Sequence, residues 1–341
     1  MAMAKKIISL FLVLVAFKFA ISSAMAWGTL THIRMSSEAG NPYPGWKMEY
    51  LSGSIAPDGG YLISNEWGSK FHGYNVGEAL RIGNTLFVLS QNSKERAFAK
   101  GWLAHLMQDR VAHGNGLGLP RDPAFGVGYS NFAAKKYGID HISAEFFVNG
   151  RVLNEKGWNW DFVTFAVPID LVIKTMNTLY GQSPPRDRLI DAYNTFAAEY
   201  YGELAFWQTP TGKALTSLFM AGTVGDYDDY VQEVNCNPYY TSIYLTNNPQ
   251  VSRPSILLEN SAENEIANIW KGWMRGYAKN LEESEALEIS RKIEKGWLLI
   301  EFKSFDKSRA DIVAREMLRN MNLSGKTAEI LKFQNSEIEK G

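Results

Sequence analysis

Apolar residues follow the period of an α-helix over most of this chain. Residues 94–113 read as one such helix, with Asn92 and Ser93 before them as the two candidate capping residues and Gly114 after them as a stop signal. The same period recurs over residues 168–181 and 186–206. The strict alternation that is typical of strands is sparse, and no internal repeat is found. The pattern predicts an all-α fold of many helices.

A Pro- and Asn-rich stretch over residues 247–254 divides the chain, and we interpret it as a linker. Residues 27–246 before it form the predicted main domain. Residues 255–341 after it are rich in charge, and their acidic and basic residues are nearly balanced. This segment is predicted to be a helical extension with a solvated surface rather than a nucleic-acid-binding arm. Its helical spacing rests on Ile266, Ile269, Trp270, Trp273 and Tyr277, and on Ile312, Val313 and Met317.

The first 26 residues read as an export signal. Two lysines precede an apolar run over residues 7–21, and residues 24–26, Ala-Met-Ala, form a small-x-small cleavage site. The run is short for a membrane span of about 20 residues and carries a lysine, which argues against an uncleaved anchor. We expect cleavage before Trp27 and a secreted or periplasmic mature protein.

The composition narrows the functional classes further. With 45% hydrophobic and 21% charged residues, the chain has the proportions of a globular protein, which excludes disordered and collagen-like proteins. A formal net charge of −1 argues against a broad cationic surface for duplex nucleic acid or anionic lipid. Cys236 is the single cysteine, so no internal disulfide can form.

Residues able to bind metal recur at a spacing of four. His105, Asp109 and His113 lie within the predicted helix 94–113, and four residues advance a helix by about 400°, so all three side chains share one face. His141 and Glu145 repeat the spacing. One such pair alone is more often a surface salt bridge.

The neighbours of these residues favour a buried site. Trp102, Leu103, Leu106 and Val111 make the helix largely apolar, and several ionisable groups are not buried together without a compensating charge. A bound metal is the simplest compensation.

Three more candidate ligands lie upstream. His32 follows closely after the predicted cleavage site, while Asp58 and His72 stand in segments that read as loops. Taken separately, Asp58 reads as a turn residue and His72 as a surface histidine. Together with the two helical groups, these residues account for all five histidines of the chain.

In this set and order of residues the chain resembles the zinc-dependent phospholipase C superfamily, which shares its helical fold with fungal single-strand nucleases. It is most similar to the phospholipase C/D domains, such as that of glycosylphosphatidylinositol-specific phospholipase D, because Asp109 and His113 are separated by three residues. The resemblance covers residues 27–150 by motif. It implies a fold built around a cleft with three zinc ions, and these ligands: Trp27, His32, Asp58, His72, His105, Asp109, His113, His141 and Glu145.

The resemblance also implies how the ligands divide. The first zinc would take Asp58, His72, His105 and Asp109. The second would take His113, His141 and Glu145, with positions left open for water or substrate. The third would take His32, Asp109 as a bridge, and the α-amine and carbonyl oxygen of Trp27. Because an α-amine is free only at a chain end, the export signal would have to be removed before the third zinc could bind.

The implied activity is that of a zinc-dependent phosphodiesterase which cleaves phospholipid headgroup esters with metal-bound hydroxide. Asp58 and Asp109 are the candidate catalytic residues, Asp109 as the bridge and Asp58 as a secondary proton acceptor. The expected partners are a phosphodiester substrate and, transiently, a membrane surface, with no stable nucleic-acid partner. The sequence leaves the oligomeric state open.

Two alternatives stay open at this point. A nuclease of the same fold would need basic residues along a groove, and Arg110 is the obvious contributor. A zinc-binding module without catalysis is the other alternative.

A choline box built as in the phosphocholine-specific members is absent, because their acidic and aromatic positions correspond to Leu30, Gly59 and Ser69 here. An aromatic wall could instead come from Trp67, Phe71 and Tyr74, although such residues belong more often to the core.

Overall fold

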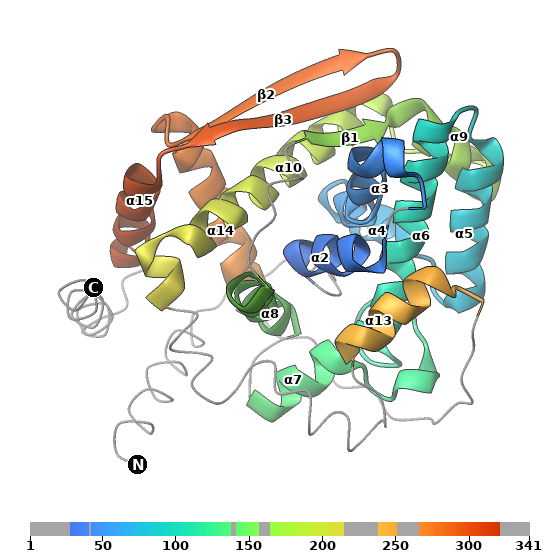
Figure 1. Cartoon of the computed structure of the whole chain (residues 1–341), viewed down its shortest axis with the longest axis horizontal. Helices are drawn as coiled ribbons and strands as arrows, with labels where there is room; N and C mark the ends of the chain where they lie inside the picture. Colours follow the sequence, from blue (N-terminus) through green and yellow to red (C-terminus); the bar gives the residue numbers. More distant parts are fainter. Residues whose placement is uncertain are drawn as a thin grey trace.

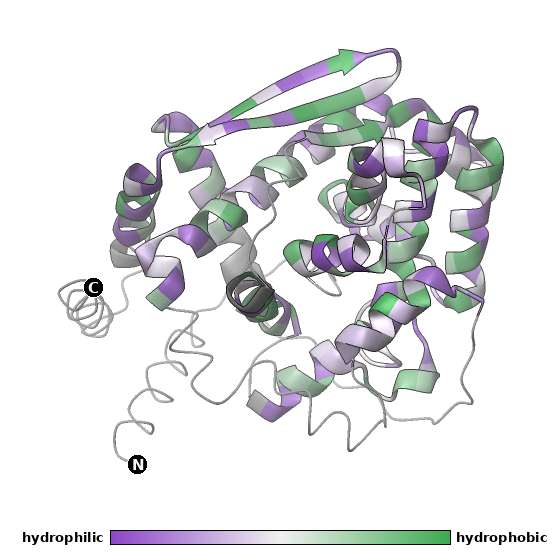
Figure 2. Ribbon diagram, in the orientation of Figure 1, coloured by the Kyte–Doolittle hydropathy of each residue, from purple (hydrophilic) through white to green (hydrophobic). Residues whose placement is uncertain are grey.

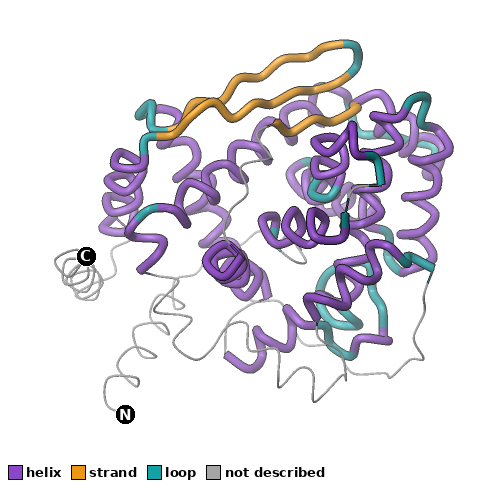
Figure 3. The backbone as a smooth tube through the Cα atoms, viewed as in Figure 1, coloured by secondary structure: helices purple, strands orange, loops and turns teal. Residues whose placement is uncertain are grey.

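The computed structural model describes residues 28–40, 42–137, 141–156, 164–214, 238–250 and 266–320. Helices make up most of these residues, and strands occur along one edge (Figures 1 and 3). The α-helices are α2 (Thr29–Ala39), α3 (Lys47–Gly53), α4 (Asn65–His72), α5 (Val76–Leu89), α6 (Ser93–His113), α7 (Tyr129–Tyr137), α8 (His141–Lys156), α9 (Ile169–Tyr180), α10 (Arg186–Gln208), α13 (Pro238–Asn247), α14 (Ile266–Glu283) and α15 (Lys307–Asn320). The short 3₁₀ helices are η1 (Pro44–Trp46), η2 (Ala56–Leu62) and η3 (Pro123–Phe125), and the strands are β1 (Thr164–Pro168), β2 (Leu287–Glu294) and β3 (Trp297–Phe305).

Helix α6 begins and ends where the sequence predicts. The Asn92 side chain accepts a hydrogen bond from the Glu95 backbone N–H (3.0 Å), and the Glu95 carboxylate accepts one from the Gln91 N–H (2.6 Å). This reciprocal arrangement satisfies donors that the first turn leaves without partners. At the other end Gly114 adopts a φ of 53°, which favours glycine. The last four turns are buried between α3, α5 and α13.

Two glycines allow α3 and α6 to pack backbone against backbone. A Cβ atom on Gly101 would lie 1.9 Å from the Tyr50 carbonyl oxygen, and one on Gly53 would lie 2.1 Å from the Phe98 carbonyl oxygen. Neither obstacle can move aside, because each is main chain. This contact brings Ser54, just after α3, to the face of α6 that carries His105.

The expected helical fold is confirmed, and α9, α10, α14 and α15 occupy segments with predicted helical spacing. The sequence analysis missed a small antiparallel sheet of order β1-β3-β2. Strand β1 pairs with β3, with Phe165 opposite Ile300, so a strand from the first half of the chain joins the C-terminal hairpin. Figure 1 shows this hairpin along one edge of the molecule.

The hairpin escaped the sequence analysis because its strands are mostly exposed. Along β2 all residues but Leu287 are exposed or half-buried, whereas Leu298 and Ile300 of β3 face the core. Both strands mix hydrophilic and hydrophobic residues (Figure 2). The local feature that is typical of a hairpin is its turn, in which Lys295 and Gly296 both have positive φ.

Among the residues that the structure describes, no helix combines the length and the apolar character needed to cross a membrane.

Close packing at Gly101 predicts a stability effect. Gly101→Ala places a methyl group against the Tyr50 carbonyl, and we expect it to destabilise the protein by about 3 kcal/mol. Gly276→Ala in α14 is the matched control, since its methyl group would meet only the flexible end of Met317. There the better helix propensity of alanine predicts a gain of up to about 1 kcal/mol. Denaturant unfolding of both variants measures the difference, and equal stabilities would contradict the packing argument.

Candidate metal centre

One face of α6 carries His105, Asp109 and His113, and all three side chains are buried. The His105 Nε2 atom lies 3.1 Å from the Asp109 Oδ2 atom, one turn further along the helix. The shared face that the spacing of four predicts is therefore present, and it points into the protein rather than into solvent.

Three upstream residues converge on Asp109. Helix α2 brings His32, whose Nε2 atom lies 3.1 Å from Asp109 Oδ1. The last residue of α4 is His72, whose Nε2 atom lies 3.6 Å from Asp109 Oδ2 and 3.4 Å from an oxygen of Asp58. The two oxygens of Asp109 thus face different histidines, His32 on one side and His72 with His105 on the other. This division is what a carboxylate that bridges two metal ions requires.

The surroundings of Asp58 and His72 differ from those that the sequence suggested. Asp58 lies in the 3₁₀ helix η2 rather than in an open turn, and its side chain is buried. His72 is also buried rather than on the surface. Donor atoms of His32, Asp58 and His105 lie within 4.8 Å of one another, and the same holds for His72, His105 and Asp109.

Hydrogen bonds to the far nitrogen orient each of these imidazoles. The Nδ1 atom of His72 donates to the Gly68 carbonyl (2.8 Å), and that of His105 donates to the Ser54 carbonyl (3.0 Å). The Nδ1 atom of His32 pairs with the Gln108 Oε1 atom at 2.6 Å. Because a carbonyl can only accept, each Nδ1 carries the proton, and the Nε2 lone pair is left for a metal.

Gln108 has its orientation fixed in turn. Its Nε2 group donates to the Ser36 and Thr246 hydroxyls, both at 3.0 Å, so its oxygen must face His32. Sequence analysis missed this residue, although a buried polar side chain next to Asp109 was a usable signal.

The donor set fits a divalent cation. Both oxygens of Asp58 and both oxygens of Asp109 are buried without a hydrogen-bond partner among the described residues. Buried carboxylates in that state are costly unless a cation lies beside them. Imidazole nitrogen and carboxylate oxygen are the ligands that zinc takes where no thiolate is offered. The cluster is therefore suited to zinc.

The electrostatics of the cluster keep Asp109, His105 and His113 in their metal-binding forms. Burial alone would raise the pKa of Asp109, but the neighbouring His105 and His32 outweigh it and hold that pKa well below its usual range. Burial lowers the pKa of His105, and it lowers the pKa of His113 to about 4. For His72, the Asp58 and Asp109 charges outweigh burial and raise the pKa. His105 and His113 are thus neutral near pH 7.

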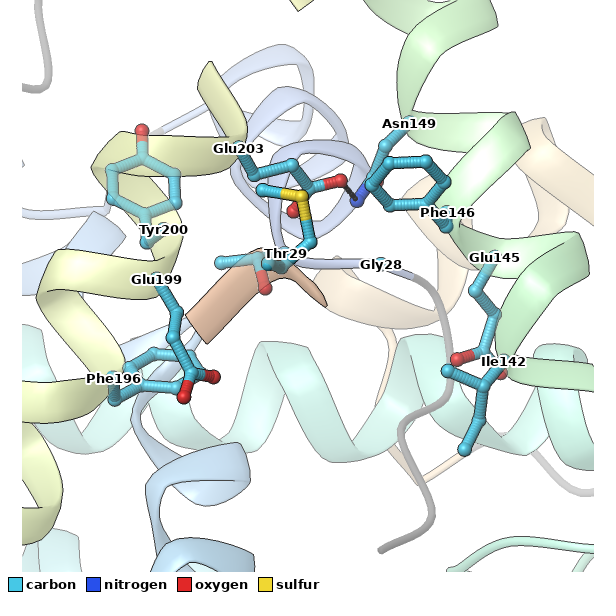
Figure 4. Close-up of a pocket in the computed structure, with 11 residues that line it drawn as sticks. Gly28, Thr29, Ile142, Glu145, Phe146, Asn149, Phe196, Glu199, Tyr200 and Glu203 are labelled. Atoms are coloured by element: carbon cyan, nitrogen blue, oxygen red, sulfur yellow. Dashed lines mark hydrogen bonds between the residues drawn. The ribbon is translucent and has the colours of Figure 1, made fainter. Parts of the chain in front are cut away.

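The second predicted group lies at the end of α6. His113 and His141 have ring centroids 6.0 Å apart at an interplanar angle of 75°, and no described residue forms a hydrogen bond with the buried His113 Nδ1 atom. Glu145 follows His141 by one turn of α8 and is also buried. Glu145 lines a pocket together with Gly28 and Thr29, at the start of α2 (Figure 4). Trp27 lies outside the described residues, so its role as a ligand stays a prediction.

Arg110 is a correction to the sequence analysis. Its guanidinium is buried and pairs with Asp122, with Nε and Oδ2 2.8 Å apart, and it also donates to the Pro249 carbonyl. A residue held in this way is not available to a substrate groove. The sequence placed Arg110 off the ligand face but gave no sign that Asp122 folds back onto it.

The aromatic residues near His72 divide between core and surface. Phe71 is fully buried and contacts Trp102, with ring centroids 5.3 Å apart, as a core residue does. Trp67 is partly buried against Phe71, whereas Tyr74 is 53% exposed. A further residue that the sequence did not indicate is Tyr193 of α10. Its ring lies where a Cβ on Gly59 would fall, and its hydroxyl is buried with no hydrogen-bond partner in the part of the chain that the structure describes.

Comparison with known proteins agrees with this geometry. The family described as zinc dependent phospholipase C matches residues 21–206, which is more than half of the chain. Two uncharacterized proteins of Archaeoglobus fulgidus are close relatives. One is 57% identical over 342 residues and covers 98% of both chains; the other is 60% identical over 298 residues and covers 86% of this chain and 97% of its own. No solved structure matches the chain.

The chain therefore belongs to the zinc-dependent phospholipase C family.

The bridging position of Asp109 predicts an order of metal loss. Asp109→Asn should weaken two zinc sites together, because a neutral amide is a poorer ligand and cannot offset two divalent charges. Asp58→Asn should weaken one site and so retain more zinc. Asp191→Asn, an exposed change on α10, is the control and should retain all of it. Elemental analysis of the purified variants gives the zinc content per chain, and a full complement in Asp109→Asn would rule out the bridge.

Gln108 offers a test of ligand orientation. Gln108→Met removes the oxygen that faces His32 at similar volume, and we expect zinc affinity at the His32 site to fall roughly 10- to 100-fold. Gln108→Glu keeps an acceptor at that place and should bind zinc more tightly than Gln108→Met. Competition with a chelator measures both affinities. Equal affinities in wild type and Gln108→Met would mean that the contact does not orient the ligand.

Proposed function

We propose that the protein is a secreted zinc-dependent phosphodiesterase that hydrolyses phospholipid headgroup esters. Membership of the zinc-dependent phospholipase C family supports this activity. The observation that carries the proposal is the buried cluster around Asp109, whose two oxygens face separate histidines and have no hydrogen-bond partner among the described residues. Such a cluster serves zinc better than it serves a metal-free core.

The ligands divide into three groups. Asp58, His72, His105 and Asp109 would hold one zinc ion; His113, His141 and Glu145 would hold a second; His32, Asp109 and the terminal residue Trp27 would hold a third. Zinc is a Lewis acid that makes water more acidic and stabilises the negative charge that builds up on a phosphate during hydrolysis.

The protein's own side chains set the conditions for this chemistry. Asp109 stays anionic because its pKa is held low, so it can balance two cations. Asp58 is the second carboxylate of the cluster and can accept a proton from an attacking water. The carbonyls of Gly68 and Ser54 fix the imidazoles of His72 and His105, so the donors need little rearrangement.

Export belongs to the same proposal. The predicted cleavage before Trp27 would free the α-amine that the third site needs, and Gly28 already lies beside Glu145 at that end of the chain. The substrate class implies transient contact with a membrane surface. A stable nucleic-acid partner is not part of the proposal, since Arg110 is occupied by Asp122.

Turnover of three substrates tests the activity. A phosphocholine ester, a phosphoinositide and single-stranded DNA are offered to the zinc-loaded exported protein, with Asp109→Asn as the inactive control. We expect hydrolysis of a phospholipid substrate that a chelator abolishes and zinc restores. Phosphocholine should not be strongly preferred, because Leu30 and Gly59 are buried and neither carries an acidic or aromatic side chain. Hydrolysis of DNA alone, or of none of the three, would contradict the proposal.

The N-terminal ligand makes a separate prediction. Protein made in the cytoplasm with a methionine before Trp27 lacks the free tryptophan amine, and we expect it to bind fewer zinc ions and to lose most activity. Exported protein that begins at Trp27, checked by N-terminal sequencing, should bind close to three. Equal zinc content and activity in the two forms would remove Trp27 from the ligand set.

A further inference from the structure

Helix α2 is capped by a residue from another helix. Its N-cap, Gly28, has no side chain with which to satisfy the first turn. The Oδ1 atom of Asn149, on α8, accepts hydrogen bonds from the Thr31 hydroxyl (2.8 Å) and from the Thr31 backbone N–H (3.0 Å), which it shares with the Gly28 carbonyl (2.9 Å). Asn149 and Thr31 are both buried, so solvent does not replace these bonds. The start of α2 is thereby fixed to α8.

Asn149 is itself held in one orientation. Its Nδ2 group donates to the Glu203 Oε1 atom at 2.7 Å (Figure 4). The Trp207 Nε1–H donates to the same oxygen at 3.2 Å. Because Glu203 accepts from the amide nitrogen, the amide oxygen must face Thr31. Glu203 and Trp207 of α10 therefore fix the orientation of the Asn149 side chain.

The backbone at residue 28 lies directly against this amide. A Cβ atom on Gly28 would fall 2.1 Å from the Asn149 Nδ2 atom. Gly28 has a φ of −61°, so space rather than backbone conformation demands glycine here. The chain just before α2 has little freedom to shift past Asn149.

Asn149 lies on the same face of α8 as two predicted zinc ligands. His141, Glu145 and Asn149 follow one another at intervals of four along α8, so they share a face. On α2, Thr31 directly precedes His32, whose Nε2 atom faces Asp109. One amide therefore connects the helix of the second predicted zinc site to the segment that serves the third.

We propose that Asn149, supported by Glu203 and Trp207, is a positioning residue that sets the start of α2 relative to α8 and thereby positions His32, a predicted ligand of the third zinc. This inference rests on the proposed function in that a third site is predicted at His32 and Trp27. It assigns Asn149 no contact with metal or substrate.

Substitution of Asn149 in the exported full-length protein tests the inference through zinc binding. Asn149→Ala removes the cap, and we expect the zinc content to fall by close to one ion per chain, or the affinity of the weakest site to fall roughly 10- to 100-fold. The readouts are elemental analysis and chelator competition, with thermal melting to report folding. Retention of wild-type zinc content and affinity in Asn149→Ala would overturn the inference.

Asp311→Ala is a matched control. The Oδ1 atom of Asp311, on α15, accepts from the Thr211 N–H (3.0 Å) and the Thr211 hydroxyl (2.7 Å), as Asn149 does from Thr31, and its Oδ2 atom pairs with Arg315 (2.6 Å). It should lower the melting temperature comparably and leave zinc binding unchanged. If it lost zinc to the same extent as Asn149→Ala, general destabilisation would explain the effect and the inference would fail.

A rescue pair keeps the test decisive if Asn149→Ala does not fold. Asn149→Asp retains an acceptor for Thr31 but sets two carboxyl groups against each other at Glu203, so zinc binding should fall. Adding Glu203→Gln removes one of the two facing carboxyl groups and lets an amide N–H donate to residue 149. The same atom can no longer accept from Trp207, so zinc binding should recover in part. Failure of the double variant to recover while folded would contradict the positioning role. Because zinc is counted directly, loss of hydrolysis in the wild type would reject the proposed function without deciding this test.

Discussion

Burial of the Asp109 carboxylate is the constraint on which the rest of this structure depends. It lies in the middle of α6 with no hydrogen-bond partner among the described residues, close to Asp58 and to the imidazoles of His32, His72 and His105. A pair of carboxylates in a dry interior is stable only if positive charge adjoins it. His72, whose pKa these carboxylates raise, supplies part of that charge when no metal is present, and divalent cations would supply it fully. Three different helices place a histidine beside the Asp109 carboxylate.

Packing around α6 serves that arrangement. Backbone contact between α3 and α6 brings the Ser54 carbonyl to His105, and the end of α4 brings His72. Helices α2 and α8 carry His32, His141 and Glu145 and are joined through Asn149. The C-terminal part joins the same structure through two contacts. Strand β1 pairs with β3, and helix α10, whose Glu203 holds Asn149, packs against α14. The C-terminal residues 266–320 are thus built onto the helices that surround the centre.

Much of the centre could be predicted from the sequence because its chemistry is periodic. A spacing of four places His105, Asp109 and His113 on one face whatever the tertiary structure is, and the capping signals of α6 are local. Contacts between distant segments could not be read in this way. Asp122 pairs with Arg110 through a loop, and Asn149 meets Thr31 over 118 residues. The β2–β3 hairpin was missed because its apolar positions are few and half-exposed, so helical spacing nearby was the stronger signal.

Anomalous X-ray scattering at the zinc edge, from crystals of the exported protein, tests the central claim most directly. The account predicts anomalous peaks at the buried cluster, two of which lie about 2.0 to 2.2 Å from separate oxygens of Asp109. A third peak should lie among His113, His141 and Glu145. Absence of zinc at Asp109, or one ion alone in contact with that carboxylate, would contradict it.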